Sequence, residues 1–176
     1  SARMIDVAPS IAWLLGVDDH PEGVGPTGRT RPGALLRRQD GDPLTDLFDR
    51  GGAQHVVVLL LDGCNSNVLY DAIDGGHAPA IAALAERGST LGHGLFASLP
   101  TATLANHTTA STGAHPGHSG VLHNMWFNRA TNNVPDLLAM DQVFDAMIHL
   151  DPLVETIHQA IHRTNPDAFT AAMFEF

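Results

Sequence analysis

The fold is decided by one continuous apolar stretch that ends in an acid and a glycine, Val56-Val57-Val58-Leu59-Leu60-Leu61-Asp62-Gly63. A run of valines and leucines without polar alternation is typical of a strand buried on both faces of a parallel sheet. Gly63 allows the chain to turn tightly where the strand ends. The stretch therefore predicts a central strand of an α/β fold, with Asp62 at its carboxyl end.

Helical patterns lie on both sides of this predicted strand. They cover residues 1–17, 65–73, 79–87, 103–112, 137–149 and 152–163. We expect Asp6 to cap the first helix and Asp151 to cap the last, with Pro152 in its first position. Residues 89–99 are a strand or an extended loop, and residues 169–176 predict a second buried strand. Strands alternating with helices indicate an α/β fold. Because these strands are too few to complete a sheet, we expect the chain to hold only part of the domain.

One internal boundary is visible before the predicted strand. Residues 18–49 are rich in proline and glycine, which is typical of loops. Four arginines lie in this segment and are expected on the solvated surface: Arg29, Arg31, Arg37 and Arg38. We therefore divide the chain into an N-terminal segment, residues 1–50, and a main segment, residues 51–176.

Composition narrows the function classes. The 176 residues are 44% hydrophobic, enough for a buried core, and a single cysteine excludes an internal disulfide framework. The net charge is −10 and all nine basic residues are arginine, which argues against binding the backbone of a nucleic-acid duplex. A phosphorylated substrate stays compatible with this charge, because a bound divalent metal supplies positive charge locally. No apolar run is long enough to span a bilayer, and the absence of an apolar leader favours the cytoplasm over export.

Three positions carry candidate chemistry. Asp62, at the carboxyl end of the predicted strand, suits an oxygen ligand for a divalent metal or, alternatively, a helix cap. Thr101 or Thr103, at the start of a helix, suits a nucleophile whose negative charge the helix N-terminus stabilises, or else a plain N-cap. Asn124 suits a donor to an anionic oxygen, or a turn residue.

The candidate residues belong to a series of motifs whose order along the chain resembles that of a known protein family. Its elements are Asp62-Gly63, a helix from Ala78-Pro79 to Gly88, the stretch Pro100-Thr101-Ala102-Thr103-Leu104-Ala105-Asn106-His107, the stretch Thr112-Gly113-Ala114-His115-Pro116, and Asn124. Over residues 56–127 this set resembles the type I phosphodiesterase/nucleotide pyrophosphatase family of the alkaline phosphatase superfamily. Residues 6–16, with Gly28-Arg29 after them, resemble the segment that ordinarily closes domains of this superfamily, although here they precede the first strand.

The resemblance implies a three-layer α/β/α fold with a mostly parallel central sheet, and a site that holds two divalent metal ions, usually zinc. It implies that Thr103 is the nucleophile and a metal ligand, that Asp62 is a metal ligand, and that Asn124 binds a phosphate oxygen. The implied substrate is a phosphorylated small molecule such as a nucleotide. Departures from the family pattern fall at Ser119, where the family has histidine, and at Ala105 and His123.

Two alternatives to a phosphodiesterase stay open. The chain is also similar to phosphonoacetate hydrolase, which cleaves a C–P bond with the same nucleophile segment. The second alternative is a non-catalytic remnant or interaction domain that lacks the full metal set. Most metal ligands of the family lie further along the chain than Phe176, outside this sequence.

The remaining histidines and the cysteine are expected to lie outside the reaction centre or to have supporting roles. His158 and His162 lie four residues apart, a spacing that suits a metal pair, but they fall on the polar side of their helix and are expected on the surface. We expect one or two loop histidines to contact substrate, from the set His93, His115, His118 and His123. Cys64 is expected to be a packed thiol at a helix start.

Overall fold

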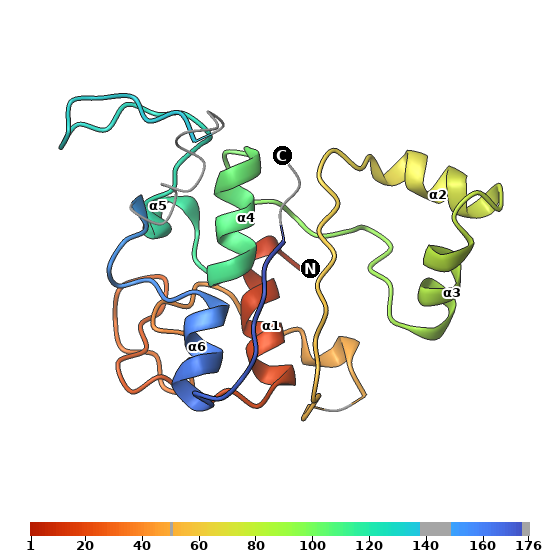
Figure 1. Cartoon of the computed structure of the whole chain (residues 1–176), viewed down its shortest axis with the longest axis horizontal. Helices are drawn as coiled ribbons and strands as arrows, with labels where there is room; N and C mark the ends of the chain where they lie inside the picture. Colours follow the sequence, from red (N-terminus) through yellow and green to blue (C-terminus); the bar gives the residue numbers. More distant parts are fainter. Residues whose placement is uncertain (50, 138–148, 174–176) are drawn as a thin grey trace.

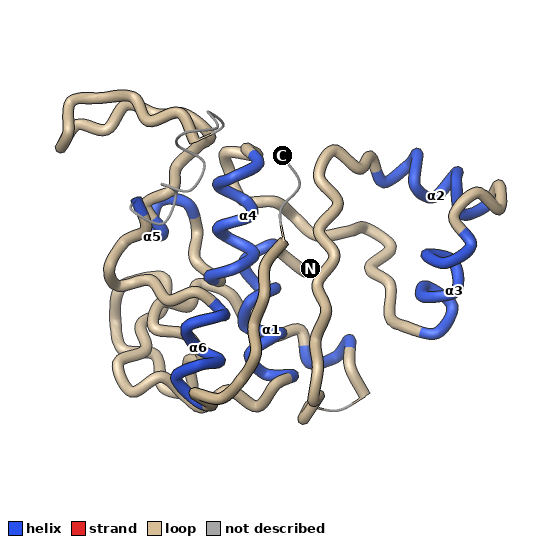
Figure 2. The backbone as a smooth tube through the Cα atoms, in the orientation of Figure 1, coloured by secondary structure: helices blue, strands red, loops and turns tan. Residues whose placement is uncertain are grey.

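The computed structural model describes residues 1–49, 51–137 and 149–173, which fold as helices joined by long loops (Figures 1 and 2). The described elements are η1 (Met4–Asp6), α1 (Val7–Leu14), η2 (Thr45–Leu47), α2 (Ser66–Asp74), α3 (Pro79–Arg87), α4 (Thr103–Thr112), α5 (Pro116–Ser119) and α6 (Ile157–Thr164). Within the described ranges, β pairing is limited to isolated bridges such as the one between Arg3 and Phe96.

The main hydrophobic core lies around α1, which packs against α4 and α6 (Figure 1). Its buried members come from both ends of the chain: Ala8, Ala12, Val17, Leu35, Leu36, Ile157 and Ala160. The N-terminal segment and the last helix therefore share one core. The domain boundary between residues 50 and 51 stays a prediction.

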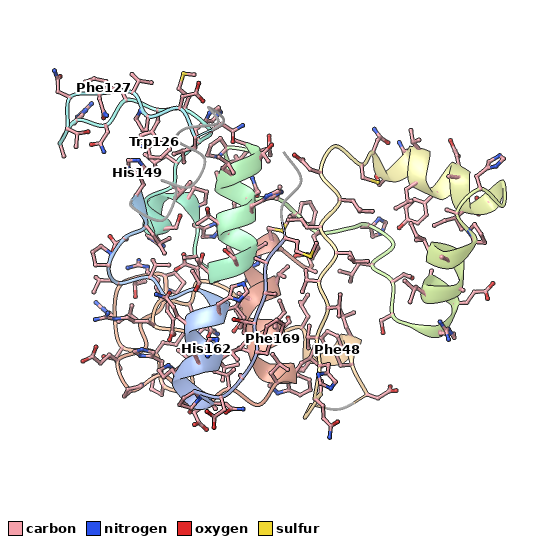
Figure 3. All side chains as sticks on the ribbon, viewed as in Figure 1. Phe48, Trp126, Phe127, His149, His162 and Phe169 are labelled. Carbon is pink, nitrogen blue, oxygen red and sulfur yellow. The ribbon has the colours of Figure 1, made fainter. Side chains whose placement is uncertain are left out.

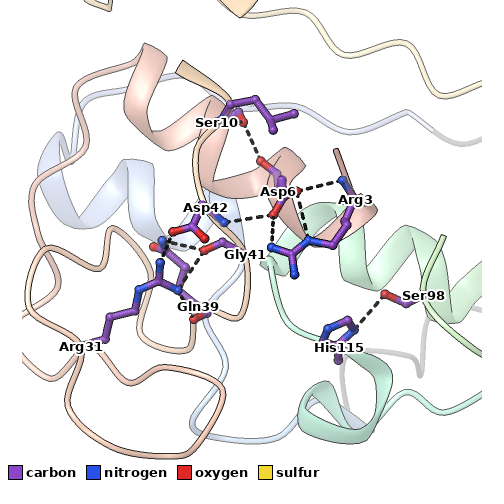
Figure 4. A network of polar contacts seen from close by, with 10 residues as sticks. Arg3, Asp6, Ser10, Arg31, Gln39, Gly41, Asp42, Ser98 and His115 are labelled. Atoms are coloured by element: carbon purple, nitrogen blue, oxygen red, sulfur yellow. Dashed lines mark hydrogen bonds and ion pairs between the residues drawn. The ribbon is translucent and has the colours of Figure 1, made fainter. Parts of the chain in front are cut away.

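A buried carboxylate holds the N-terminal loops to the start of α1 (Figure 4). Asp6 occupies the N-cap position of α1, but its side chain does not cap that helix. Its carboxylate instead accepts hydrogen bonds from the Arg3 backbone N–H at 2.8 Å and the Asp42 N–H at 3.0 Å, and it pairs with the Arg3 guanidinium at 3.1 Å. The expected role of Asp6 as a cap of α1 is thus replaced by a link between the start of α1 and the loop at Asp42.

Gly113 ends α4 where this helix meets α1. Its φ is +68°, in the left-handed region where only glycine is free of steric cost. A Cβ at this position would lie 2.9 Å from Pro9 Cδ and 3.1 Å from Leu36 Cδ1. Glycine is therefore required both by the backbone and by the close approach of α1.

Residues 51–97 form a largely exposed region, which we call the arm. Its two ends are hydrogen-bonded to the N-terminal segment, through Ala53 to Leu14 and through Phe96 to Ala2 and Met4. It carries α2 and α3 and extends away from α1, α4 and α6 (Figure 1), and none of its described residues is buried. The sequence predicts both helices, and their bounds agree with its patterns to within one residue. Asn65 caps α2 by accepting from the N–H groups of Asn67 and Val68, and Pro79 begins α3.

The buried central strand predicted over residues 56–61 is not found. These residues run as an extended segment without β pairing, and the side chains of Val57 and Leu59 are 84% and 77% exposed. A strand needs neighbours to bond its N–H and C=O groups, and no part of the chain that the structure describes supplies one. The sequence pattern therefore predicts the extended conformation of this segment correctly, but the predicted burial is wrong.

The predictions for the C-terminal part of the chain also differ from the structure. The second strand is not present over residues 169–173, where Phe169 and Met173 are 92% and 96% exposed. The last helix begins at Ile157, not at Pro152, because Thr156 and Gln159 form a capping box there. The helix predicted over residues 137–149 lies almost entirely outside the described residues.

Three of the arginines expected on the solvated surface, Arg31, Arg37 and Arg38, are instead partly buried. Arg31 donates to the carbonyls of Gln39 and Gly41 at 2.9 and 3.0 Å. Such contacts satisfy backbone carbonyls in loops that have no regular partner. No helix within the described ranges has the length and apolar content needed to cross a membrane.

Candidate active site

Thr103 is the first residue of α4, one position after the N-cap. The N-cap is Ala102, whose side chain offers no oxygen, so neither Thr103 nor Thr101 caps the helix. Thr103 is half-buried, and Thr101 is exposed. The alternative that one of these threonines serves as the N-cap is therefore wrong, and the Thr103 hydroxyl is left beside the positive end of α4.

Asn124 supplies the missing cap from the loop that follows α5. The Leu104 N–H, one of the free donors of the first turn, donates to Asn124 Oδ1 at 2.9 Å. The Asn124 carbonyl accepts from the Leu137 N–H at 2.9 Å. Leu104 and Leu137, whose N–H groups make these bonds, also belong to the second core cluster, together with Val121 and with Trp126 packed against it. The structure thus bonds Asn124 to the residue that follows Thr103, and the role of Asn124 in binding a phosphate oxygen stays a prediction.

The amide of Asn106 holds the loop that leads into α4. Asn106 Oδ1 accepts from the Ser98 N–H at 2.9 Å. Its Nδ2 donates to the carbonyls of Ser98, Pro100 and Ala102 at 3.2, 3.0 and 3.2 Å. The side chain is buried one turn after Thr103, and it defines the path of the residues on either side of Thr101. The sequence places Asn106 in a motif but indicates no role for it.

A buried carboxylate from the N-terminal segment reaches the loop after α4. The Asp40 side chain is fully buried, and its Oδ2 accepts from the His115 backbone N–H at 2.8 Å and lies 2.7 Å from His118 Nδ1. His115 Nδ1 in turn lies 3.0 Å from Ser98 Oγ (Figure 4). These bonds connect the N-terminal segment to the loop held by Asn106. Nothing in the sequence around Asp40 signals this role, because both partners lie in a distant part of the chain.

Asp62 stands apart from these groups. It is exposed, and its Oδ1 accepts from the N–H of the adjacent Gly63 at 2.8 Å. Since Asn65 caps α2, the helix-cap alternative for Asp62 is wrong. No contact joins Asp62 to Thr103 or Asn124 among the described residues, so its role as a metal ligand stays a prediction.

The described residues do not assemble a metal centre. Across the ranges that the structure covers, no three side chains from histidine, cysteine, aspartate and glutamate gather closely enough to hold a metal ion. The two predicted donors, the Asp62 carboxylate and the Thr103 hydroxyl, lie on separate segments. The residues present therefore do not fit a two-metal site on their own.

Two further expectations about side chains can be compared with the structure. His162 is exposed and lies 3.0 Å from Thr170 Oγ1, and His158 is half-exposed, in keeping with surface positions. Cys64 is exposed, so the expected packed thiol is wrong. The reason is the same as for residues 56–61, since in the described residues the arm has no layer to pack against.

Comparison with known proteins supports the family resemblance that was inferred from the order of the motifs. Residues 56–175, more than half of the chain, match the family described as type I phosphodiesterase / nucleotide pyrophosphatase. No curated protein and no solved structure matches the chain.

Proposed function

Since the chain belongs to the type I phosphodiesterase / nucleotide pyrophosphatase family, a family of hydrolases, we propose that it hydrolyses a phosphate diester or pyrophosphate bond through a covalent intermediate on Thr103. Membership implies an alkaline-phosphatase-like fold, of which the described residues hold helices but no sheet. The family's substrates are phosphorylated compounds, which agrees with the substrate class expected for this chain.

The observation that carries the proposal is the bond from the Leu104 N–H to Asn124 Oδ1 at 2.9 Å. Because the amide oxygen is engaged by α4, the amide NH₂ of Asn124 is the donor left for a ligand at the start of this helix. It has no hydrogen-bond partner among the described residues. A phosphoryl group on the Thr103 hydroxyl would meet this donor and the positive end of α4 together.

The reaction follows from these positions. Thr103 Oγ1 forms a bond to phosphorus while the bond from phosphorus to the leaving oxygen breaks. The hydroxyl proton passes to solvent, and the leaving oxygen takes a proton from solvent. Water then attacks the phosphoryl-threonine and releases Thr103, while Asn124 donates to the same non-bridging oxygen in both steps.

The family typically uses metal ions, and our proposal includes two divalent ions, zinc by preference, with Asp62 and Thr103 among their ligands. Among the described residues, no three potential ligands gather closely enough to hold a metal ion. We therefore derive no step through the ions.

The test is turnover of bis(p-nitrophenyl) phosphate by the full chain with added Zn²⁺. We expect Thr103→Ala to lower kcat/KM by at least about 100-fold, because the covalent step is lost. The matched control is Thr101→Ala, an exposed threonine shortly before it in the chain, which should retain the wild-type rate. Equal rates for the wild type and Thr103→Ala would overturn the assignment of Thr103 as the nucleophile.

The two alternatives give distinct outcomes in the same experiment. Release of acetate from phosphonoacetate, with no turnover of the diester, would identify a C–P hydrolase. No turnover of either compound by the wild type, with a folded chain in excess metal, would identify a non-catalytic protein.

A further inference from the structure

We propose that a small cavity in the N-terminal segment binds an organic carboxylate, with the anionic group on Arg38 and Arg37. The cavity measures about 310 Å³, at the lower end of the size range of small-molecule sites. Six residues line it: Glu22, Val24, Gly28, Arg37, Arg38 and Leu153. Five of the six precede residue 56, where the family match begins, and the proposal does not depend on the reaction at Thr103.

Backbone hydrogen bonds build the frame of the cavity. Val24 is paired with residues 37–39, because its N–H donates to the Arg37 carbonyl and its carbonyl accepts from the Gln39 N–H, both at 2.9 Å. The Gly28 N–H donates to the Gly25 carbonyl at 2.9 Å and closes the turn at the edge of the cavity. A Cβ at Gly28 would enter open space, so this side stays accessible. The two lining arginines therefore start from a stretch of backbone that is held in place.

The loops that carry these residues are bonded to the last part of the chain. The Arg37 N–H donates to Glu155 Oε2 at 3.1 Å, and the Arg163 guanidinium donates to the Leu35 carbonyl at 2.9 Å. Figure 3 shows the loops of the N-terminal segment beside α6, the helix on which His162 is labelled. These bonds also fix the stretch just before α6, which supplies the sixth lining residue.

Arg38 carries a guanidinium that has few partners for its burial. Its side chain is only 13% exposed. Within the described residues, its Nε and Nη1 have no hydrogen-bond partner, and its Nη2 donates only to the Pro26 carbonyl, at 3.5 Å. Burying the N–H donors of a guanidinium without acceptors costs free energy. A carboxylate in the cavity would accept from the Nη donors that these residues leave unused.

The Asp40 carboxylate does not fill this role. Its Oδ1 lies 3.8 Å from Arg38 Nε, beyond hydrogen-bond distance. Its Oδ2 accepts from the His115 N–H and lies 2.7 Å from His118 Nδ1. Asp40 therefore offsets part of the buried charge of Arg38 and leaves its Nη groups without an acceptor.

Arg37 supplies a second guanidinium to the same cavity. Its Nη1 donates to the Pro152 carbonyl at 3.2 Å, and its Nη2 pairs with Glu22 at 3.3 Å. The Glu22 side chain is 72% exposed, and an ion pair of this kind contributes little free energy, so a ligand displaces it at low cost. Two guanidiniums can thus face one bound anion.

The other lining residues select the class of anion. Val24 and Leu153 offer apolar walls, and Leu153 is 51% exposed, so an apolar body on the ligand would cover it. The Glu22 carboxylate repels a dianion more strongly than a monoanion. A planar carboxylate matches the planar fork of a guanidinium. These features together favour a monocarboxylate with a small apolar body over inorganic phosphate.

The test measures binding by the full chain, apart from any turnover. We titrate the ¹⁵N-labelled wild type with benzoate and follow its ¹H–¹⁵N spectrum. We expect saturable shifts of signals from residues that line the cavity. Benzamide, which has the same shape without the charge, and inorganic phosphate, which lacks the apolar body, should each bind at least about 10-fold more weakly than benzoate.

A pair of arginines supplies the matched control. Arg38→Met removes the lining guanidinium and keeps an apolar stem, whereas Arg29→Met removes an exposed guanidinium of the same segment that does not line the cavity. Loss of charge-assisted hydrogen bonds should weaken benzoate binding roughly 10- to 150-fold in Arg38→Met. Arg29→Met should bind benzoate as the wild type does. Circular dichroism first verifies that both variants keep the helix content of the wild type.

The ligand comparison uses only the wild type, so it decides the proposal even if Arg38→Met does not fold. Equal affinities for benzoate and benzamide, or no saturable shift with benzoate, would overturn the anion site. Phosphate binding as tight as benzoate binding would overturn the carboxylate class. A folded Arg38→Met that binds benzoate as the wild type does would overturn the role of this guanidinium, whatever the chain does to a phosphate diester.

Discussion

Two regions of the molecule differ in burial: the core around α1, α4 and α6, and the arm, residues 51–97. Both regions carry helices and apolar stretches. α4 contains five buried residues, whereas α2 and α3 contain none. The helices of the arm rest on local signals, the Asn65 cap and Pro79 at the first position, which act without a partner layer. The apolar segment of residues 56–61 has no such local solution, because an extended chain must find its hydrogen bonds elsewhere. A helix forms its backbone hydrogen bonds within itself, so α2 and α3 form in the exposed arm. A strand needs a neighbour for these bonds, and residues 56–61 therefore stay unpaired.

The largest expected effect compares one substitution in the two regions. Leu36 is fully buried in the core, whereas Leu59 in the arm is 77% exposed. Leu36→Ala should lower the free energy of unfolding by about 2–5 kcal/mol, since it removes contacts and leaves a cavity. Leu59→Ala should change this free energy by at most ~0.5 kcal/mol, because it alters only exposed surface. Urea unfolding followed by circular dichroism measures both, and similar losses in the two variants would show that the arm is packed in solution.

A pair of glycines provides an intermediate effect. Gly113 and Gly76 have φ values of +68° and +74°, but a Cβ added at Gly113 would lie within 3.1 Å of Pro9 and Leu36, while one at Gly76 would enter open space. Gly76→Ala should cost about 1 kcal/mol from the backbone alone, and Gly113→Ala should cost roughly 1–3 kcal/mol more. Thermal unfolding of both variants tests this. Equal shifts in Tm would mean that α1 and α4 are not in contact at Gly113.

The smallest effect concerns pH. Burial lowers the pKa of His20, with Glu155 opposing the shift and Arg163 and Arg37 adding to it. The neutral ring is also favoured by its Nδ1, which accepts from the Glu22 N–H at 3.0 Å. A lowered folded-state pKa means that the unfolded chain binds more protons, so this contribution is complete above the unfolded value of about 6.5 and is lost as pH falls through the folded value.

We therefore expect the stability of the wild type to fall more steeply below about pH 6.5 than that of His20→Gln. The measurement is urea unfolding at several pH values between about 5 and 7.5. His77→Gln, which replaces an exposed ring in the arm, controls for the loss of one histidine from the chain. Parallel pH profiles for the wild type and His20→Gln would contradict the shift.

The helix that carries the candidate nucleophile and the family could be predicted, because their signals are local or ordered along the chain. The start of α4 at Thr103 follows from the pattern of residues 103–112, and the order of motifs up to Asn124 led to the family that residues 56–175 match. The partners of Asp40 and the hydrogen bonds of the Asn106 amide could not be predicted. The Asp40 bonds join residues 75 and 78 positions apart in the chain, and the Asn106 bonds go to backbone groups, which carry no residue identity to recognise.

The sequence by itself determined the family, the helices of the arm, the position of Thr103 at the first turn of α4 and the candidacy of Asn124. Caps, apolar periodicity and motif order act over a few residues, so they can be interpreted before any folding. Only the tertiary structure decided that Asn124 caps α4, that Asp40 reaches His115 and His118, and that residues 57–61 are exposed. Burial and long-range hydrogen bonds are properties of neighbours, and which segments become neighbours is settled only when the chain packs.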